Sequence, residues 1–442
     1  YISQNMSSWM PASENVRVAA RKIFEDLQNI LDVKFVESSH YGGVNVVSIS
    51  HSFEENIAGF SYFPNNFYEI GSDVFISTIA RSPQFISEKL TNYDYQVLVH
   101  EIGHALGLKH PFEADRENIF ILLPEEDNSN NTVMSYELVA SSYEGLFQPL
   151  DLMALAKFYG VNPKFRSGDD VYGLSTESGT FIIDGGGNDW IDTSQFVNDV
   201  YVDVRPTAHS YGHLKSPHIT SSYQLTISHN TDIENVRTGI GNDNILGNSL
   251  NNMIYSGSGD DKIFGGFGRD LIVSGPGNDV IDLSETQQEK DMVVVEFEDI
   301  GKGIDTIFGF TQGVLGDVLI FEGIVSSATE LLPVISTKNV PEGYITEHIL
   351  RIVDLFSISA EYLSSAFDKG GLLSTLEIEE TDPILVIAAS SQETGSEQVV
   401  FSLENVEGEH SVETLVNLKG NYLDIDNWTI NNFLDTSTSL VV

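Results

Sequence analysis

Three histidines and a glutamate fall within the stretch HEIGHALGLKH, residues 100–110 of the sequence. On a helix, residues four apart lie on the same face, so His100 and His104 can hold one metal ion together. Gly107 permits the left-handed backbone conformation that ends a helix, after which the chain can turn back and present His110 as a third nitrogen ligand. Three protein ligands and one open position are typical of catalytic zinc rather than structural zinc.

Glu101 directly follows the first histidine, so its carboxylate can reach a water molecule on the same ion. Zinc lowers the pKa of such a water to about 7 and polarises a carbonyl group, while Glu101 can take the water proton and pass it to a leaving amine. Two histidines four apart are often incidental, but the chance of the whole pattern is on the order of 10⁻⁴. The pattern therefore predicts a zinc-dependent hydrolase with Glu101 as general base.

The extended motif resembles that of the metzincin metalloproteases, and the resemblance implies a tight turn with a methionine beneath the zinc. The stretch NTVMSYE supplies Met134 for this turn. In the serralysin branch of the family, a tyrosine two residues later can also reach the zinc. Here that residue is Tyr136, to which the resemblance assigns both a metal-binding and a catalytic role.

A second pattern occupies residues 238–282, which divide into the nonapeptides TGIGNDNIL, GNSLNNMIY, SGSGDDKIF, GGFGRDLIV and SGPGNDVID. The eighth position is always isoleucine, and the sixth is Asp or Asn. The glycine-rich half of such a repeat turns, and the other half is a short strand whose apolar residue points inward. Two nonapeptides make one coil of a parallel β-roll, so turns on one side of the roll recur every 18 residues.

The sixth-position side chains then stack on two flanks of the roll, with Asp243, Asp261 and Asp279 on the first flank and Asn252 and Asp270 on the second. A calcium ion between successive turns takes turn carbonyls and these side chains as oxygen ligands. Without the ion the carboxylates repel each other, so we expect the roll to need calcium to fold. A flexible Gly/Asp-rich linker is the alternative, but a linker would not keep isoleucine in register.

The amino-acid composition of the chain excludes some classes of function. The chain has 442 residues, 41% of them hydrophobic, which is enough for several folded domains. Its 65 acidic and 22 basic residues give a net charge of −43, which should repel nucleic acid and anionic membranes. The acidity is either a solvating surface or a supply of calcium ligands, and the repeats favour the second interpretation for their own segment. The chain has no cysteine, which excludes thiol chemistry and cysteine-ligated zinc.

Periodicity predicts the elements that position these residues. Apolar residues at helical spacing predict a helix in ENVRVAARKIFEDLQNILDV with Ser13 as its N-cap, and further helices near residues 93–106 and 149–160. Short strands are predicted in VKFVES, GVNVVSIS, IAGFSYF and SDVFIST, and β-type runs return after residue 284. We expect an α/β metzincin zinc protease domain at 1–165, an all-β parallel β-roll that binds calcium at 166–320, and a C-terminal β-rich extension at 321–442 for secretion or partner binding.

The zinc motif followed by these repeats is similar to the serralysins, secreted zinc endopeptidases of bacteria with RTX calcium-binding repeats, over about residues 1–320. The resemblance implies one catalytic zinc, several structural calcium ions, protein or peptide substrates and an extracellular location. It also implies a propeptide removed before Tyr1 and export by type I secretion machinery from a C-terminal signal, for which NNFLDTSTSLVV is the candidate. We expect a monomer that binds neither nucleic acid nor membrane.

The resemblance also implies ligand sets and a substrate strand. FRSGDDVYG and DGGGND are similar to the family's first calcium loops, and the implied ligands are Arg166, Gly168, Asp170, Asp184, Gly186 and Asp189 for one site and Gly187, Asp189, Asp232 and Glu234 for its neighbour. In the roll they are Gly239, Gly241, Asp243, Ser256, Gly257, Ser258, Gly259, Asp261, Ser274, Pro276 and Asp279 on the first flank, and Asn248, Leu250, Asn252, Gly265, Phe267 and Asp270 on the second. Substrate is expected to pair by β-augmentation with the strand edge formed by Ala58, Gly59, Phe60, Ser61 and Tyr62.

Two other functions stay open at this point. The protein could be a calcium-dependent binding or adhesin module with a non-proteolytic metzincin domain, although the intact Glu101 argues against this alternative. The tail at 325–442 could bind a partner or a sugar in addition to proteolysis. The segment PFEADRENIFILLPEEDNSN, which follows His110, departs from the family pattern, so the side-chain specificity of cleavage is not predicted.

Overall fold

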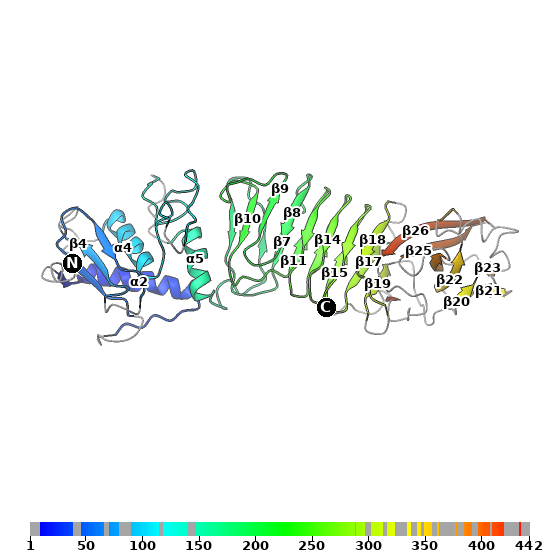
Figure 1. Ribbon diagram of the computed structural model, residues 1–442, viewed down its shortest axis with the longest axis horizontal. Coiled ribbons are helices and arrows are strands. Elements are labelled where there is room, and N and C mark those ends of the chain that lie inside the picture. The colour runs from blue at the N-terminus through cyan, green and yellow to red at the C-terminus, as the bar shows by residue number, and fades with distance from the viewer. Residues whose placement is uncertain are drawn as a thin grey trace. The chain divides into compact units, whose positions relative to one another are not determined.

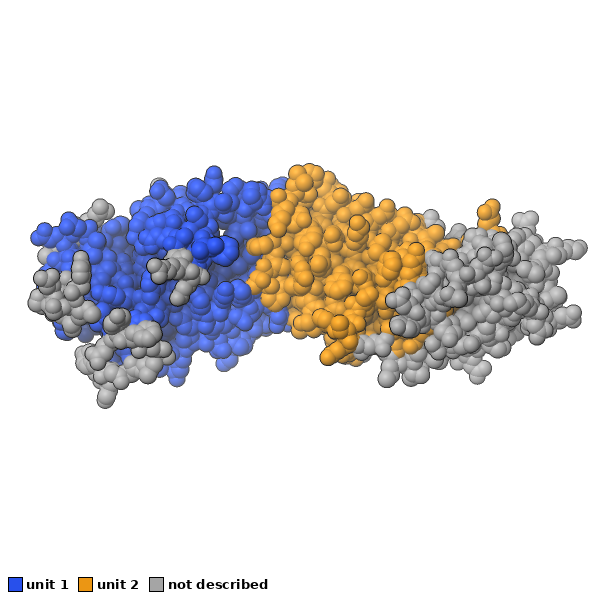
Figure 2. Space-filling view, viewed as in Figure 1, with its two compact units in different colours: residues 1–169, 175–187, 216–232 blue, residues 170–174, 188–215, 233–442 orange. Residues whose placement is uncertain are grey.

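The chain folds into two compact units, shown in different colours in Figure 2. The computed structural model describes residues 9–38, 46–65, 70–78, 90–114, 118–139, 147–287, 289–296, 302–312, 316–322, 334–336, 343–345, 349–355, 360–361, 376–378, 384–390, 397–406, 409–419 and 433–434. Unit 1 comprises residues 1–169, 175–187 and 216–232, and unit 2 comprises residues 170–174, 188–215 and 233–442. Two segments therefore return to unit 1 after the chain has first entered unit 2.

Unit 1 combines helices with a small mixed sheet (Figure 1). Its helices are α2 (Glu14–Ile30), α4 (Asn92–Ala105) and α5 (Pro149–Tyr159). Its four-stranded sheet has the order β1-β2-β4-β3, with β1 at Trp9–Pro11, β2 at Ile49–Ser52, β4 at Val74–Ser77 and β3 at Gly59–Ser61. Strands β2 and β4 are parallel, and β3 pairs antiparallel with β4 at the sheet edge. The unit also holds the parallel pair β6 (Thr180–Ile182) and β10 (Gln224–Ile227).

The three predicted helices are present, but one predicted strand is wrong. The described residues 33–38, VKFVES, form no strand. Side chains of this segment contact α2 and its backbone does not pair in a sheet. The Phe35 ring lies 4.7 Å from that of Phe24 on α2, and Glu37 forms an ion pair with Arg21. Strands occur in the other three predicted stretches but are shorter than predicted, and residues 43–45 of GVNVVSIS lie outside the described residues.

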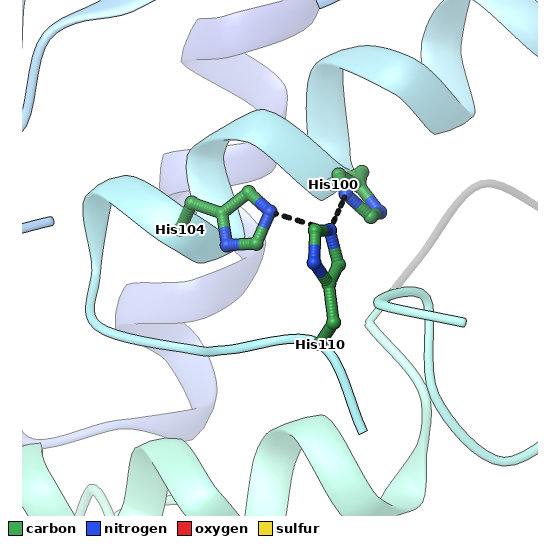
Figure 3. A group of neighbouring side chains, drawn as sticks. All are labelled: His100, His104 and His110. Atoms are coloured by element: carbon green, nitrogen blue, oxygen red, sulfur yellow. Dashed lines mark hydrogen bonds between the residues drawn. The ribbon is translucent and has the colours of Figure 1, made fainter. Parts of the chain in front are cut away.

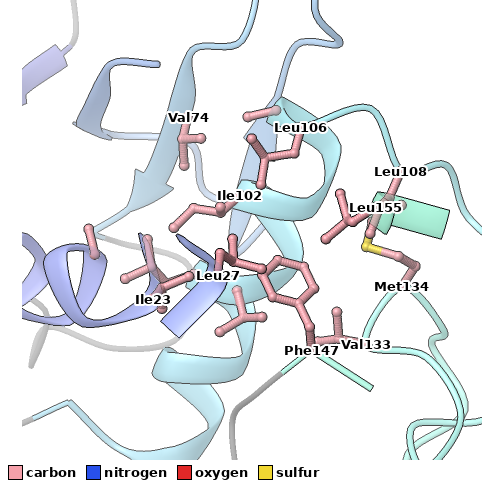
Figure 4. Close-up of a cluster of buried hydrophobic side chains, with 14 of the residues drawn as sticks. Ile23, Leu27, Val74, Ile102, Leu106, Leu108, Val133, Met134, Phe147 and Leu155 are labelled. Carbon is pink, nitrogen blue, oxygen red and sulfur yellow. The ribbon is translucent and has the colours of Figure 1, made fainter. Parts of the chain in front are cut away.

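The core of unit 1 lies between the three helices and the sheet (Figure 4). Ile23 and Leu27 of α2, Ile102 of α4 and Leu155 of α5 are each at most 2% exposed. Helix α4 begins with a capping box, in which Thr91 and Asp94 exchange hydrogen bonds at 3.2 and 2.9 Å. Because the apolar face of α4 is fixed in the core, the rotation of the helix and the direction of its histidines are fixed as well.

Unit 2 is built from short parallel strands in two stacks. The first stack contains β12 (Asn244–Leu246), β14 (Lys262–Phe264), β16 (Val280–Asp282) and β18 (Asp305–Phe308). The second contains β7 (Trp190–Asp192), β11 (Asn235–Arg237), β13 (Met253–Tyr255), β15 (Leu271–Val273), β17 (Met292–Glu296) and β19 (Val318–Glu322). Each of these strands contains an apolar residue that is at most 2% exposed, and these residues are Ile245, Ile263, Ile281, Ile307, Ile191, Val236, Ile254, Ile272, Val293 and Leu319. Ile245 pairs with Ile263 and Ile254 with Ile272, which is the 18-residue register that the repeat predicts.

Apart from one separate two-stranded pair, the remaining strands of unit 2 extend these stacks. Early in the unit are β5 (Val171–Tyr172), which pairs with β7, and the antiparallel pair β8 (Val200–Asp203) and β9 (His209–Gly212). The later strands are β20 (Val334–Ser336), β21 (Gly343–Ile345), β22 (Ile349–Leu355), β23 (Leu376–Ile378), β24 (Ile384–Ser390), β25 (Glu397–Val406), β26 (Glu409–Lys419) and β27 (Phe433–Leu434). Strand β26 pairs with β18 and β27 with β19, both parallel. Residues 431–432 and 435–442 of the expected secretion signal lie outside the described residues. Within the described part of the chain, no helix combines the length and the apolar character needed to span a membrane.

Candidate metal centres

Three imidazole rings converge beside the C-terminal end of α4 (Figure 3). Nε2 of His110 lies 3.0 Å from Nε2 of His104 and 3.2 Å from Nε2 of His100. Gly107 follows the helix with a φ of +107°, and the chain then turns back toward the two helical histidines. The structure therefore brings the three predicted nitrogen ligands together in the way that their spacing predicts.

Backbone carbonyls determine which nitrogen of each helical histidine faces the centre. Nδ1 of His100 donates to the Val133 carbonyl at 2.9 Å, and Nδ1 of His104 donates to the Leu108 carbonyl at 2.7 Å. A ring with its proton on Nδ1 presents the Nε2 lone pair, which is the metal-binding form. Burial is the main cause that lowers the pKa of His104 and lowers that of His100 to about 3, which favours the neutral form of both rings. Lone pairs that converge this closely repel each other unless a cation lies among them, so the donor set fits zinc.

The turn around Met134 lies directly under the histidine cluster. Met134 is 1% exposed, and a Cβ on Gly103 of α4 would lie 2.7 Å from its sulfur atom. The glycine of HEIGH therefore allows the turn to approach the helix. The Tyr136 hydroxyl lies 2.9 Å from His110 Nε2, at the point where the histidine nitrogens meet. The roles that the resemblance assigns to Met134 and Tyr136 stay predictions.

A buried carboxylate on α5, Asp151, holds this turn in place. It is 2% exposed and accepts hydrogen bonds from the Thr132 hydroxyl at 2.5 Å, the Val133 N–H at 2.8 Å and the Gln148 N–H at 2.9 Å. The Val133 carbonyl is the group that orients His100, so the chain of contacts runs from α5 to the metal centre. Burial raises the pKa of Asp151 to about 6. Sequence spacing gave no sign of this role, because the partners lie up to 19 residues away.

Glu101 is 6% exposed and packs against the edge strand β3. The Ser61 hydroxyl donates to Glu101 Oε2 at 3.0 Å, and a Cβ on Gly59 would lie 2.8 Å from Glu101 Cγ. Burial raises the pKa of Glu101 to about 7, against the smaller lowering effect of the Ser61 hydrogen bond. The expected base and the expected substrate strand, residues 58–62, are therefore direct neighbours.

The segment after His110 presents apolar side chains near the centre. The Phe112 ring stacks on the His110 ring with a centroid distance of 5.1 Å. Lys109 Nζ donates to the Phe120 carbonyl at 2.8 Å and so ties the segment to the ligand loop. Ile119 and Phe120 are 71% and 80% exposed. Such a surface next to the histidines is suited to contact apolar side chains of a bound peptide.

In unit 2, the sixth-position aspartates form a ladder along the first flank. The N–H of Asp243 donates to Asp261 Oδ1 at 2.7 Å, and the N–H of Asp261 donates to Asp279 Oδ1 at 2.8 Å. The other carboxylate oxygen, Oδ2, of all three aspartates is buried without a hydrogen-bond partner among the described residues. Burial is the main cause that raises the pKa of Asp261 to about 7 and that of Asp279 to about 8. Buried oxygens of this kind fit calcium, a hard cation that prefers carboxylate and carbonyl ligands.

The other expected ligands of the roll lie in turns that stack one coil apart. The N–H of Ser258 donates to the Gly239 carbonyl at 2.9 Å, and the N–H of Phe267 donates to the Asn248 carbonyl at 2.8 Å. On the second flank, the N–H of Asn252 donates to Asp270 Oδ1 at 2.8 Å. The Asn252 side chain differs from the aspartates because its amide already donates to the Glu234 carbonyl and its oxygen accepts from the Asn248 N–H.

The ligands expected for the two calcium sites before the roll are divided between the two units. Arg166, Gly168, Asp184, Gly186, Gly187 and Asp232 belong to unit 1, whereas Asp170, Asp189 and Glu234 belong to unit 2. Within unit 2, the N–H of Asp170 donates to Asp189 Oδ1, and the N–H of Asp189 donates to Glu234 Oε2, both at 2.8 Å. These two sites stay predictions.

Comparison with known families and proteins gives a consistent result. Residues 76–152 match the description "Metallo-peptidase family M12B Reprolysin-like", and residues 246–281 match the RTX calcium-binding nonapeptide repeat in four copies. Serralysin of Proteus mirabilis is 31% identical over 274 residues, which cover 53% of this chain and 54% of that protein. Metalloprotease AprA of Pseudomonas entomophila is 27% identical over 293 residues, which cover 58% of this chain and 57% of that protein.

The matches thus span about half the length of these curated relatives. The metallopeptidase region implies zinc, which the histidine cluster fits, and the RTX repeats imply calcium, which the buried aspartates fit. The chain is therefore a serralysin homologue over about half its length, with a reprolysin-like metallopeptidase region followed by RTX calcium-binding repeats.

Proposed function

We propose that this protein is a secreted zinc endopeptidase that cleaves extracellular proteins and depends on calcium for its fold. The observation that carries the proposal is the convergence of three imidazole rings next to a buried carboxylate and a sheet edge. A structural zinc site would be closed by a fourth protein ligand, whereas here Tyr136, 63% exposed, approaches from the open side. Similarity to the serralysins supports extracellular location and protein substrates.

The residues of this site would have separate roles in peptide hydrolysis. His100, His104 and His110 would hold zinc through Nε2. The chemistry that bound zinc supplies is Lewis acidity, which polarises a peptide carbonyl and makes water more acidic. Glu101 accepts the proton of the attacking water and delivers it to the leaving amine, a role for which a pKa near 7 is well suited. The Tyr136 hydroxyl is placed to donate a hydrogen bond to the developing oxyanion.

Substrate would bind as an added strand along β3. Strand β3 pairs with β4 on one side and is the last strand of its sheet, so its other edge can accept an extended peptide. Pairing through the main chain allows peptides of many different sequences to bind. The hydrogen bond between Ser61 and Glu101 sets the position of strand β3 relative to the general base. The exposed Ile119 and Phe120 would favour apolar side chains in the bound peptide.

The competing proposal is a calcium-dependent adhesin whose metallopeptidase region is inactive. An inactive scaffold would need neither the carbonyl-oriented histidines nor the glycine that makes room for Glu101 at residue 59. These features favour the enzyme, since they fix catalytic geometry and add nothing to adhesion.

The decisive experiment compares Glu101→Gln with the wild-type chain. We expect the variant to keep one zinc per chain and to lose about 10²–10⁴-fold in peptide cleavage, the usual contribution of a general base. The exposed Glu137→Gln, which makes the same charge change next to Tyr136, is the matched control and should keep its activity. Cleavage by zinc-loaded Glu101→Gln at the wild-type rate would refute the assignment.

A further inference from the structure

A short apolar segment of unit 1, residues 118–123 with the sequence NIFILL, lies on the protein surface. Ile119, Phe120 and Ile121 are all exposed, although side chains of this kind lose free energy when they stay in contact with water. The segment forms neither a helix nor a strand, so other contacts must hold its backbone. Neighbouring large apolar side chains that are held in solvent indicate a surface that contacts a partner.

The neighbours of His110 in the chain hold this apolar segment. The Lys109 ammonium group donates to three backbone carbonyls, which belong to Glu113, Asn118 and Phe120. The N–H of Leu122 donates to the Pro111 carbonyl at 2.9 Å. The residues directly before and after His110 therefore both contact the apolar segment, which places it beside the third histidine of the metal centre.

A buried carboxylate holds the other end of the apolar segment. The N–H of Glu126 donates to the Leu123 carbonyl at 2.9 Å, and the Glu126 side chain is buried. Its Oε1 accepts hydrogen bonds from the N–H and the hydroxyl of Thr220, both at 3.2 Å. Thr220 belongs to residues 216–232, which return to unit 1 after the chain has entered unit 2. The returning residues thus fix the segment from a distant part of the sequence.

Two exposed aromatic rings lie beside the histidine cluster. The Phe112 ring is nearly parallel to the His110 ring, with an angle of 6° between their planes. The Phe63 ring stands edge-on to the His104 ring at a centroid distance of 5.5 Å. Phe112 follows Pro111 in the chain and so belongs with the apolar segment on the His110 side of the centre. Phe63 follows β3 and belongs to the side where the substrate strand is expected.

The position and the charge of this surface point to one kind of occupant. A peptide paired with β3 passes the histidine cluster, so its side chains next to the cleaved bond can reach the residues that flank the metal ligands. Glu113 and Glu125, both exposed, flank the apolar segment in the chain and disfavour an acidic partner or an anionic membrane. An apolar side chain of the substrate fits both observations.

We infer that Lys109 and Glu126 are positioning residues that hold the apolar segment as one wall of a substrate subsite. The subsite takes a large apolar side chain, of the size of leucine or phenylalanine, next to the bond that is cut. The inference rests on the proposed function and names the substrate class of the same site. Because the two residues act through the segment, they set the binding of apolar peptides and leave the chemical step unchanged.

The test uses the full chain, loaded with zinc and calcium, and two series of peptides that differ at one residue beside the cleaved bond. One series carries leucine and the other serine, and each side of the bond is varied in turn. In Phe120→Ala, kcat/KM for the leucine peptides should fall about tenfold on one side of the bond, while the serine peptides are cleaved as by the wild type.

Lys109→Met should raise KM for the same leucine peptides about tenfold and keep kcat, because the side chain keeps its length and loses its donors. Lys109→Arg, which keeps a charged donor, should restore most of the loss. Lys164→Met is the matched control, because Lys164 is an exposed lysine of the same unit. Zinc content is measured for each variant, so a loss of the metal is distinguished from a loss of the wall.

The Glu126 variants test the other end of the segment without a change near His110. Glu126→Ala should lose the preference for leucine, whereas Glu126→Gln keeps an oxygen that can accept from Thr220 and should retain it. If Phe120→Ala and Glu126→Ala cleave both series as the wild type does, or lose both equally, the inference is overturned and the proposed function stands. It is also overturned if sedimentation shows that Phe120→Ala only separates paired copies of the chain. If the wild type cleaves neither series, the proposed function fails as well.

Discussion

The two candidate metal centres are organised in opposite ways. In unit 1 the ligands are imidazole rings, and each helical ring is oriented by a carbonyl that belongs to a different part of a packed core. In unit 2 the ligands are carboxylates whose main partners are the backbone of the next coil and each other. When the ion is removed from the first centre, the two helical rings keep their carbonyl partners, whereas removing ions from the second leaves buried like charges. From this comparison we expect unit 1 to fold without zinc, whereas we expect the roll to need calcium in order to fold.

The largest expected effect is therefore the loss of calcium. We expect a calcium chelator such as EGTA to unfold the roll between residues 189 and 319 while α2, α4 and α5 keep most of their structure. Each site filled at 1,000 times its dissociation constant contributes about 4 kcal/mol, so several sites exceed the stability of an ordinary domain. Circular dichroism and hydrogen exchange, resolved by segment, will measure the loss.

The matched control for this experiment is a chelator selective for zinc in the presence of calcium. It should abolish cleavage and leave both units folded, since the histidines keep their carbonyl partners. If unit 1 unfolds when zinc is removed, or if the roll stays folded in EGTA, the two centres do not differ in the way proposed.

The second prediction separates two positions of the same repeat. Asp261 carries a buried oxygen without a described partner and lies between two successive expected sites of the first flank. Asn252 satisfies its own amide with the Glu234 carbonyl. Asp261→Ala should therefore raise the calcium concentration needed for folding more than Asn252→Ala. Calcium titrations followed by circular dichroism give the two midpoints, and equal midpoints would show that the ladder does not coordinate ions.

The third prediction concerns pH. Without calcium, burial raises the pKa of Asp261 from 3.8 to about 7 and that of Asp279 to about 8. Between pH 4 and 8 the folded state then binds more protons than the unfolded state, so the stability of the calcium-free roll must fall as pH rises. With calcium the trend reverses, because protons compete for the same oxygens. Circular dichroism of the roll at pH 5 and pH 8, with and without calcium, tests both signs; a calcium-free roll that keeps more β structure at pH 8 than at pH 5 would contradict the prediction.

The sequence predicts those parts of each centre that are set by local spacing. Four residues separate His100 from His104 on one helix face, and Gly107 allows the return to His110, so the zinc ligands could be found without a structure. The carbonyls of Val133 and Leu108 could not, because every residue has a carbonyl and only tertiary packing selects these two. The order of polar and apolar residues in VKFVES resembles that of a strand. This order does not show whether the segment pairs in a sheet or packs against a helix, as it does here.

The same limit applies to the roll. Regular nonapeptides reveal the aspartates up to Asp279, whereas the later members of the hydrogen-bonded ladders, Asp291, Asp305 and Asp317, are separated by loops of unequal length that hide the period. The degenerate copy GKGIDTIF contains the glycine and aspartate of the pattern, so a search that tolerates insertions would have found Asp305. Asp291 and Asp317 lack that glycine and are identified only by their register in the stack.

A smaller effect is expected at Asp151, where unit 1 does depend on a buried charge. One Asp151 oxygen accepts from Val133 and Gln148 while the other accepts from Thr132. In Asp151→Asn one of these oxygens becomes an NH₂ group that faces a donor, which should cost about 1–3 kcal/mol of unfolding free energy. Thermal unfolding measures the loss, with the exposed Glu137→Gln as control. Zinc affinity should fall together with stability because Val133 orients His100; unchanged stability and zinc affinity would argue against the network.

The smallest effect is expected on the outer surface of the roll, where a second ladder runs beside the first. At the fifth repeat position, the N–H of Asp260 donates to Asn242 Oδ1 and the N–H of Asn278 donates to Asp260 Oδ1, both at 2.9 Å. These side chains are exposed and their hydrogen bonds compete with water, so they stabilise the coils only slightly. Asp260→Ala should lower the unfolding midpoint by about one or two degrees and leave the calcium requirement unchanged. Asp261→Ala, one residue further along, should change both. If Asp260→Ala shifted the calcium midpoint as much as Asp261→Ala does, the shift would reflect loss of net charge, and the buried position of the inner ladder would have no special role.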